Sequence, residues 1–183
     1  VEHHGLIDCI DPVQYSVRLL VPPGSALLTP PAKHPTPMAQ FLGEHDVPVD
    51  EKGRIFVPAE FRKKLPPEAN ETLVIVRGFD RCLTAYPQHI WEVTADKLLG
   101  LPQTERKIRG FIRAMLSQAA EVKMDRQGRA SIPRKLLDKA NIVDQMVVFG
   151  ALDKLEFWNP TDWQHFLNEA DPAMEEVAES LAL

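Results

Sequence analysis

The sequence predicts an α+β fold, mainly β, in which two similar halves form a pseudo-twofold barrel with short flanking helices. Three observations predict this architecture. A segment with the same residue spacing occurs twice in the chain, and each occurrence shows the order strand, strand, helix, strand, strand. The strands of one copy are too short to bury a core and leave exposed edges, so the two copies are expected to interleave.

The internal repeat carries most of this prediction. Residues 47–61 read VPVDEKGRIFVPAEF and residues 122–136 read VKMDRQGRASIPRKL, so Val, Asp, Gly, Arg and Pro coincide 75 residues apart. The similarity continues 72 residues apart through the pairs Gly78 and Gly150, Leu83 and Leu155, Tyr86 and Trp158, and Trp91 and Trp163. Each repeat is therefore a whole structural unit.

Each repeat is predicted to begin with a β-hairpin, formed in the first repeat by residues 47–49 and 54–57. Gly53 supplies the positive φ that a tight turn needs. Pro58 suits the first position of a short helix, on which Phe61 and Leu65 share one face. The remaining elements are strands at 73–76, 82–86, 146–149 and 155–158, and amphipathic helices that open at Pro87 and Pro160.

Strand parity predicts which side chains each hairpin displays. Alternate side chains of a strand face opposite ways. If Ile55 and Val57 face the core, Arg54 and Phe56 face outward. The second repeat has the same parity, with Ala130 and Ile132 inward and Arg129 and Ser131 outward.

The chain is predicted to contain two repeat domains, at 38–99 and 120–167, joined by a linker helix at 100–119 with a basic outer face. Residues 1–37 hold seven of the sixteen prolines and are expected to be disordered. Because Met38 opens a compact sequence, this segment is interpreted as a misassigned start or as a regulatory tail. The tail at 168–183 is expected to be a frayed helix or a partner-binding segment.

The net charge of -5 and the pI near 5.7 give no general attraction to nucleic acid or to anionic membranes. No stretch approaches the roughly 20 apolar residues that span a bilayer, and the start lacks the basic region of a signal peptide. Cys9 and Cys82 lack the spacing of a metal site or a disulfide framework and are expected to be free thiols in a reducing cytosol.

Local charge around the two predicted turns is nevertheless positive. The second turn has a local balance of +4 and the first a balance of +2, so an acidic chain can still offer one positive face. The basic residues concerned are Lys52, Arg54, Arg62, Lys63 and Lys64 at the first turn, and Lys123, Arg126, Arg129, Arg134, Lys135 and Lys139 at the second.

Arg54 and Arg129 are the strongest candidates for a functional role. A planar guanidinium beside a turn can bind a phosphate or contact a guanine edge at two points. In the alternative interpretation, ion pairs from Asp50 to Arg54 and from Asp125 to Arg129 only stiffen the turns. Both interpretations can hold together, with the aspartate orienting the arginine.

The doubled Asp-x-x-Gly-Arg turn followed by apolar-x-apolar-Pro resembles the MraZ family, and the resemblance runs from about Met38 to Leu167. It implies tandem AbrB/SpoVT-like swapped-hairpin halves. It also implies a cytoplasmic, nucleoid-associated repressor of a division and cell-wall gene cluster including its own gene. Such a protein assembles into a ring-shaped homo-oligomer on repeated promoter elements of double-stranded DNA. One departure is that Arg62 of the first repeat has no counterpart in the second, where Leu137 stands.

The residues expected to bind DNA are those of the two turns. They are Asp50, Lys52, Gly53, Arg54, Asp125, Arg126, Gly128 and Arg129. No catalytic residue, metal ligand or cofactor is expected, because the histidines are scattered and no His-Glu-x-x-His occurs.

Two other classes of function fit the sequence less well. An AbrB-like antitoxin or spore-type regulator uses the same half-barrel as single units in a dimer, which the duplication within one chain disfavours. A barrel-type aspartyl hydrolase would need two aspartates that share a proton. An arginine four residues after each aspartate favours the ionised carboxylate and opposes that sharing.

Overall fold

The computed structural model describes residues 40–180, with the side chains of Glu175 and Glu176 excepted. The predicted N-terminal extension, 1–37, and Cys9 lie outside the described residues. The first half contains β1 (Glu44–Pro48), β2 (Arg54–Phe56), α2 (Ala59–Lys64), the 3-10 helix η2 (Pro67–Ala69), β3 (Thr72–Arg77), β4 (Leu83–Pro87) and α3 (Gln88–Leu99). The second half contains α4 (Arg106–Leu116), β5 (Ala120–Lys123), β6 (Arg129–Ser131), α5 (Arg134–Lys139), β7 (Gln145–Ala151), β8 (Lys154–Trp158) and α6 (Pro160–Ser180). The α+β class with mainly antiparallel strands is as predicted.

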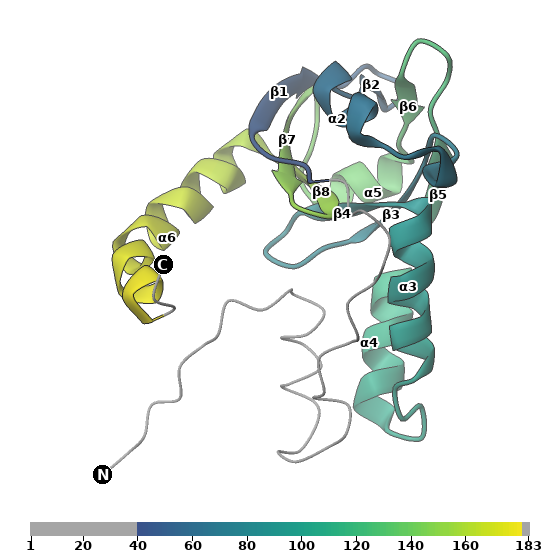
Figure 1. Cartoon of the computed structure of the whole chain (residues 1–183), viewed down its shortest axis with the longest axis vertical. Helices are drawn as coiled ribbons and strands as arrows, with labels where there is room; N and C mark the ends of the chain where they lie inside the picture. Colours follow the sequence, from purple (N-terminus) through teal and green to yellow (C-terminus); the bar gives the residue numbers. More distant parts are fainter. Residues whose placement is uncertain (1–39, 181–183) are drawn as a thin grey trace. The chain divides into compact units, whose positions relative to one another are not determined.

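The strands of the two repeats interleave, as Figure 1 shows for β1 beside β7 and β2 beside β6. Six strands form one antiparallel sheet in the order β1-β7-β8-β4-β3-β5. Exchanging each strand for its counterpart in the other repeat reverses this order and leaves the pairing unchanged. The fold therefore has the pseudo-twofold topology that the repeat predicts.

The two short strands β2 and β6 form a separate antiparallel ribbon, in which Ile55 lies opposite Ala130. The ribbon is tied at both ends to the turns. Val57 N–H donates to the Gly128 carbonyl at 3.0 Å, and Ile132 N–H donates to the Gly53 carbonyl at 2.9 Å. Each turn is thus held by the strand of the other repeat.

The predicted pairing needs two corrections. The turn of the expected hairpin is present, with Asp50 N–H donating to the Arg54 carbonyl at 3.0 Å, but β2 then pairs with β6 and not with β1. The reason is that the backbone of β1 forms its hydrogen bonds with β7. The next residue, Val49, continues this pairing, since its N–H donates to the Asp144 carbonyl at 2.8 Å. The described strands also form an open sheet plus a ribbon, and not a closed barrel.

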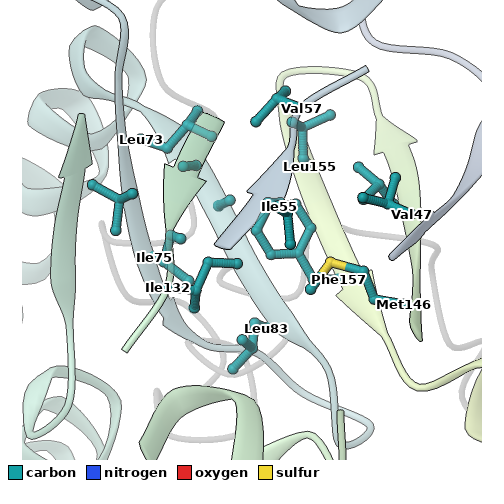
Figure 2. Packing of buried hydrophobic residues seen from close by; sticks show 14 of the residues in the cluster. Val47, Ile55, Val57, Leu73, Ile75, Leu83, Ile132, Met146, Leu155 and Phe157 are labelled. Carbon is teal, nitrogen blue, oxygen red and sulfur yellow. The ribbon is translucent and has the colours of Figure 1, made fainter. Parts of the chain in front are cut away.

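The core lies between the ribbon and the sheet, and Figure 2 shows side chains from both gathered in one cluster. Ile55 and Val57 are buried while Arg54 and Phe56 are exposed, which confirms the predicted parity. Burying a large apolar side chain contributes roughly 1.5–3 kcal/mol to the stability of the folded state. The same parity holds in β6, where Ala130 and Ile132 are buried. This burial fixes which face of the ribbon is free.

The short helix after the first turn begins one residue later than the sequence predicts. Pro58 is the N-cap of α2 and not its first residue, and Pro133 has the same place before α5. Asn159 begins α6, since its Oδ1 accepts from the N–H of Thr161 at 2.8 Å. Trp163, early in α6, packs at a tilt against Trp158, and its Nε1–H donates to Glu44 at 2.7 Å, so these aromatic rings pack the fold as predicted.

Two further segments are helical. Helix α4 falls within the predicted linker and buries Ile108 and Met115. Residues 167–180 are helical and continue α6, which contains Pro172. None of the helices described over residues 40–180 is long and apolar enough to cross a membrane.

Candidate nucleic-acid interface

The two Asp-x-x-Gly-Arg segments form the same tight turn. In the first, Asp50 Oδ1 accepts from the backbone N–H groups of Lys52 at 2.9 Å and Arg54 at 2.8 Å. In the second, Asp125 Oδ1 accepts from Gln127 at 2.9 Å and Arg129 at 3.0 Å. One oxygen of a short acidic side chain at this position thus accepts hydrogen bonds from two backbone N–H groups of the turn, which explains the aspartate in both motifs.

The glycines are needed at both turns for conformation and space. Gly53 has φ +73° and Gly128 has φ +82°, a region that side chains other than glycine rarely adopt. A Cβ at Gly53 would collide with the carbonyl oxygen of Ile132, and one at Gly128 would collide with the guanidinium of Arg62. Both turns are thus packed against groups from the other repeat.

Each arginine is held by the aspartate of its own turn. Arg54 Nε lies 2.6 Å from Asp50 Oδ2, and Arg129 Nε lies 2.7 Å from Asp125 Oδ2. Only Nε takes part, and within residues 40–180 no hydrogen bond from Nη1 or Nη2 of either arginine is found. The ion pair of the second interpretation is therefore present, and it orients the guanidinium while its two terminal nitrogens stay without a hydrogen bond among the described residues.

The hydrogen bonds of the turn lower the pKa of both aspartates. For Asp50 and Asp125 the largest cause is the bond from the backbone N–H of the arginine four residues on, and the arginine side chain adds to it. Both carboxylates are ionised at neutral pH. This is the opposite of the raised pKa that a proton-sharing aspartate pair requires.

Arg54 and Arg129 lie on the same, outward face of the ribbon. In the ribbon register Arg54 lies opposite Ser131, and Arg129 lies opposite Phe56. Both guanidinium side chains are partly exposed, at 45% and 41%. Together with Phe56 and Asp50 they line one open hollow of about 230 Å³. The structure thus brings the two motifs, 75 residues apart in sequence, to one surface.

The other predicted residues lie at the margins of this surface. Lys52 and Arg126 are exposed on the two turns. Arg126 lines a second open hollow of about 550 Å³, beside Arg62 and Lys63. These cations lie in the turns or in α2, outside the two ribbon strands.

Arg62, which the sequence assigned to the basic residues around the first turn, lies against the second turn. Its Nε donates to the Val57 carbonyl at 3.1 Å, and its guanidinium lies against Gly128 of the second turn. Leu137 takes the corresponding place beside Gly53 at the first turn. The replacement of arginine by leucine between the repeats was visible in the sequence, but its location was not, because α2 contacts the turn of the other repeat.

Metal ligation and thiol chemistry find no support in the part of the chain that is described. Across residues 40–180, no three His, Cys, Asp or Glu side chains gather in a way that could hold a metal ion. Cys82 is a free, buried thiol, and burial raises its pKa strongly. The free thiol is as predicted for Cys82.

Two copies of one arginine turn on an interleaved α+β fold define a protein built from two tandem repeats. A family model described as "MraZ protein, putative antitoxin-like" matches residues 40–113 and 115–183. The chain belongs to the MraZ family, as the resemblance indicated, and the two matches fit two tandem domains. Membership of this regulator-type family supports, in general terms, DNA binding and control of transcription.

Proposed function

We propose that this protein is a sequence-specific DNA-binding transcriptional regulator that reads promoter DNA through its two Asp-x-x-Gly-Arg turns. One observation carries the proposal. Arg54 and Arg129 lie on one outward face, and each is fixed at Nε by its own aspartate. Within the described part of the chain, their terminal guanidinium nitrogens form no hydrogen bond. The family match supports the same class of function.

The chemistry of this face suits the major groove of DNA. That groove admits a two-stranded β-ribbon, and a guanidinium can bind O6 and N7 of guanine at two points. An arginine already oriented by a carboxylate loses less conformational entropy on binding than a free one. The two ribbon arginines would therefore supply sequence choice.

Cations outside the ribbon would supply affinity that does not depend on sequence. Lys52 and Arg126 are exposed on the turns, and Arg62 and Lys63 lie at the second hollow. Phosphate contacts from such residues release counterions and make binding weaker as salt rises. This local charge is compatible with the acidic total of the chain.

The resemblance to the family gives the finer form of the proposal. The protein would act in the cytoplasm and on the nucleoid as a repressor of a division and cell-wall gene cluster including its own gene. A ring-shaped homo-oligomer would place several ribbons on repeated promoter elements. Weak binding by each subunit would then add up to avidity.

Binding of the full chain to DNA tests this function directly. Affinity is measured by fluorescence anisotropy for the duplex upstream of its own gene and for a scrambled duplex of equal composition, across a salt series. The proposal expects tighter binding to the upstream duplex and a steep loss of affinity with salt for both. Equal affinity for the two duplexes, or no binding to either, would refute sequence-specific regulation.

A further inference from the structure

The outward face of the ribbon breaks the pseudo-twofold symmetry at one pair of positions. The twofold relates Arg54 to Arg129, but it relates Phe56 to Ser131. One end of the ribbon therefore pairs an arginine with a hydroxyl group, and the other end pairs an arginine with an aromatic ring. Two ends that differ in this way cannot read the same DNA bases equally well.

Phe56 is placed to contact whatever the arginines contact. Its side chain is 57% exposed, and it lines the same hollow as Arg54 and Arg129. Within residues 40–180 no ring contact to Phe56 is found. A single exposed apolar side chain is common and decides nothing alone. What distinguishes Phe56 from other exposed apolar side chains is its place opposite Arg129 and two residues along the same strand from Arg54.

We propose that Phe56 contacts the C5-methyl group of a thymine next to the base that Arg129 contacts, and thereby gives the ribbon one preferred direction on its DNA element. The inference rests on the proposed function. The thymine methyl group is the apolar feature of the major groove, and phenylalanine is a side chain that contacts it. Ser131, at the other end, offers a hydroxyl group that can donate or accept a hydrogen bond.

A DNA base fits this surface better than a second copy of the chain would. Any partner that covers Phe56 also covers the guanidinium groups of Arg54 and Arg129, which line the same hollow. Burying those charges against apolar protein would carry a desolvation penalty. The edge of a base pair beside a phosphate backbone offers acceptors for the arginines and a methyl group for the ring in one ligand.

The direction follows from the broken symmetry. A ribbon with identical ends would bind an asymmetric DNA element equally in either orientation. With Phe56 at one end only, the orientation that places a thymine beside the Arg129 end is favoured. Each subunit would therefore bind its element in a defined sense along the promoter.

Replacing thymine by deoxyuridine isolates this contact, because it removes only the C5-methyl group. The full chain and the Phe56→Ser variant are titrated with upstream duplexes that carry one such replacement at a time. For the wild type we expect a loss of affinity of about fourfold at one thymine in each element, the factor for burying one methyl group. Phe56→Ser is expected to be insensitive to the replacement at that thymine. The matched control Ser131→Ala, on the other ribbon strand, keeps the sensitivity.

The outcomes separate this inference from the proposed function. If the wild type binds its upstream DNA but no thymine replacement alters affinity, the inference is wrong and the function stands. The same holds if Phe56→Ser keeps the full sensitivity. If Phe56→Ser changes the mass of the assembly in ultracentrifugation and leaves the methyl dependence intact, Phe56 belongs to a contact between copies. Failure of the wild type to bind any duplex would overturn the function itself.

Discussion

At the scale of single residues, each turn depends on one aspartate that acts through both oxygens. Asp50 Oδ1 binds two backbone N–H groups and Oδ2 binds Arg54 Nε. An ion pair this exposed to solvent contributes little to stability, because water screens it. Its value to the protein is therefore the orientation of the arginine more than the free energy of folding.

The lowered pKa of Asp50 and Asp125 predicts how stability depends on pH. A carboxyl group whose pKa is lower in the folded state stabilises that state fully above its unfolded pKa, about 3.9. The contribution is lost as pH falls through the folded value. Thermal unfolding is thus expected to show a drop in stability below about pH 4 that is smaller in the Asp50→Asn/Asp125→Asn double variant. An equal drop in both proteins would contradict the role of the two aspartates in stabilising the turns. The Asp96→Asn variant, which alters a carboxylate outside the turns, serves as control.

The positive φ at Gly53 predicts that its replacement by alanine destabilises the fold, and Gly43 offers a matched control. Gly43 has φ +91° with nothing near a new Cβ, so Gly43→Ala isolates the backbone strain, about 1–2 kcal/mol. Gly53→Ala adds a collision with the Ile132 carbonyl and is expected to cost about 1–3 kcal/mol more. Urea unfolding measures both. Equal losses would mean that the close approach of Ile132 is unimportant.

At the scale of elements, the sequence located the strands and turns but not their partners. The alternation of apolar and polar residues within one strand predicted that Ile55 is buried and Arg54 exposed. This prediction needs no knowledge of which strand lies alongside. Pairing of β2 with β6 depends instead on residues 75 positions away, and a hairpin was the simpler expectation. The contact of Arg62 with Gly128 was hidden for the same reason.

The position of α2 predicts a distinct role for Arg62. Leu137 already fills the corresponding place at the first turn, so Arg62→Leu is expected to keep the fold. Because the side chain would no longer offer a charge at the second hollow, affinity should fall about equally for all duplexes. The slope of log affinity against log salt should decrease by about 1. An unchanged slope, or a loss confined to one sequence, would contradict a phosphate contact; the exposed Arg106→Leu on α4 is the control.

At the scale of the whole molecule, interleaving makes each repeat incomplete without the other. β1 completes its hydrogen bonds with β7, and β5 completes its hydrogen bonds with β3. Duplication within one chain therefore supplies both partners at high effective concentration. The repeat itself predicted this dependence, since one unit has too few strands for a core.

This dependence predicts the behaviour of one repeat alone. A fragment of residues 38–116 lacks the partners of β1 and β2, so it is expected not to fold as a monomer. Circular dichroism with ultracentrifugation should find an unfolded chain, or a dimer in which a second fragment supplies the missing strands. A folded monomer with native-like stability would show that interleaving is not required.

The ribbon arginines are proposed as the DNA-reading groups, and a comparison of two double variants tests this role. Arg54→Ala/Arg129→Ala and the control Arg106→Ala/Arg113→Ala each remove two exposed cations and are titrated with the upstream duplex at one salt concentration. The ribbon variant should lose the preference for upstream over scrambled DNA while its unfolding midpoint stays close to that of the wild type. The α4 variant should keep the preference. If the ribbon variant also kept it, the two turns would be structural and the DNA-reading surface would lie elsewhere.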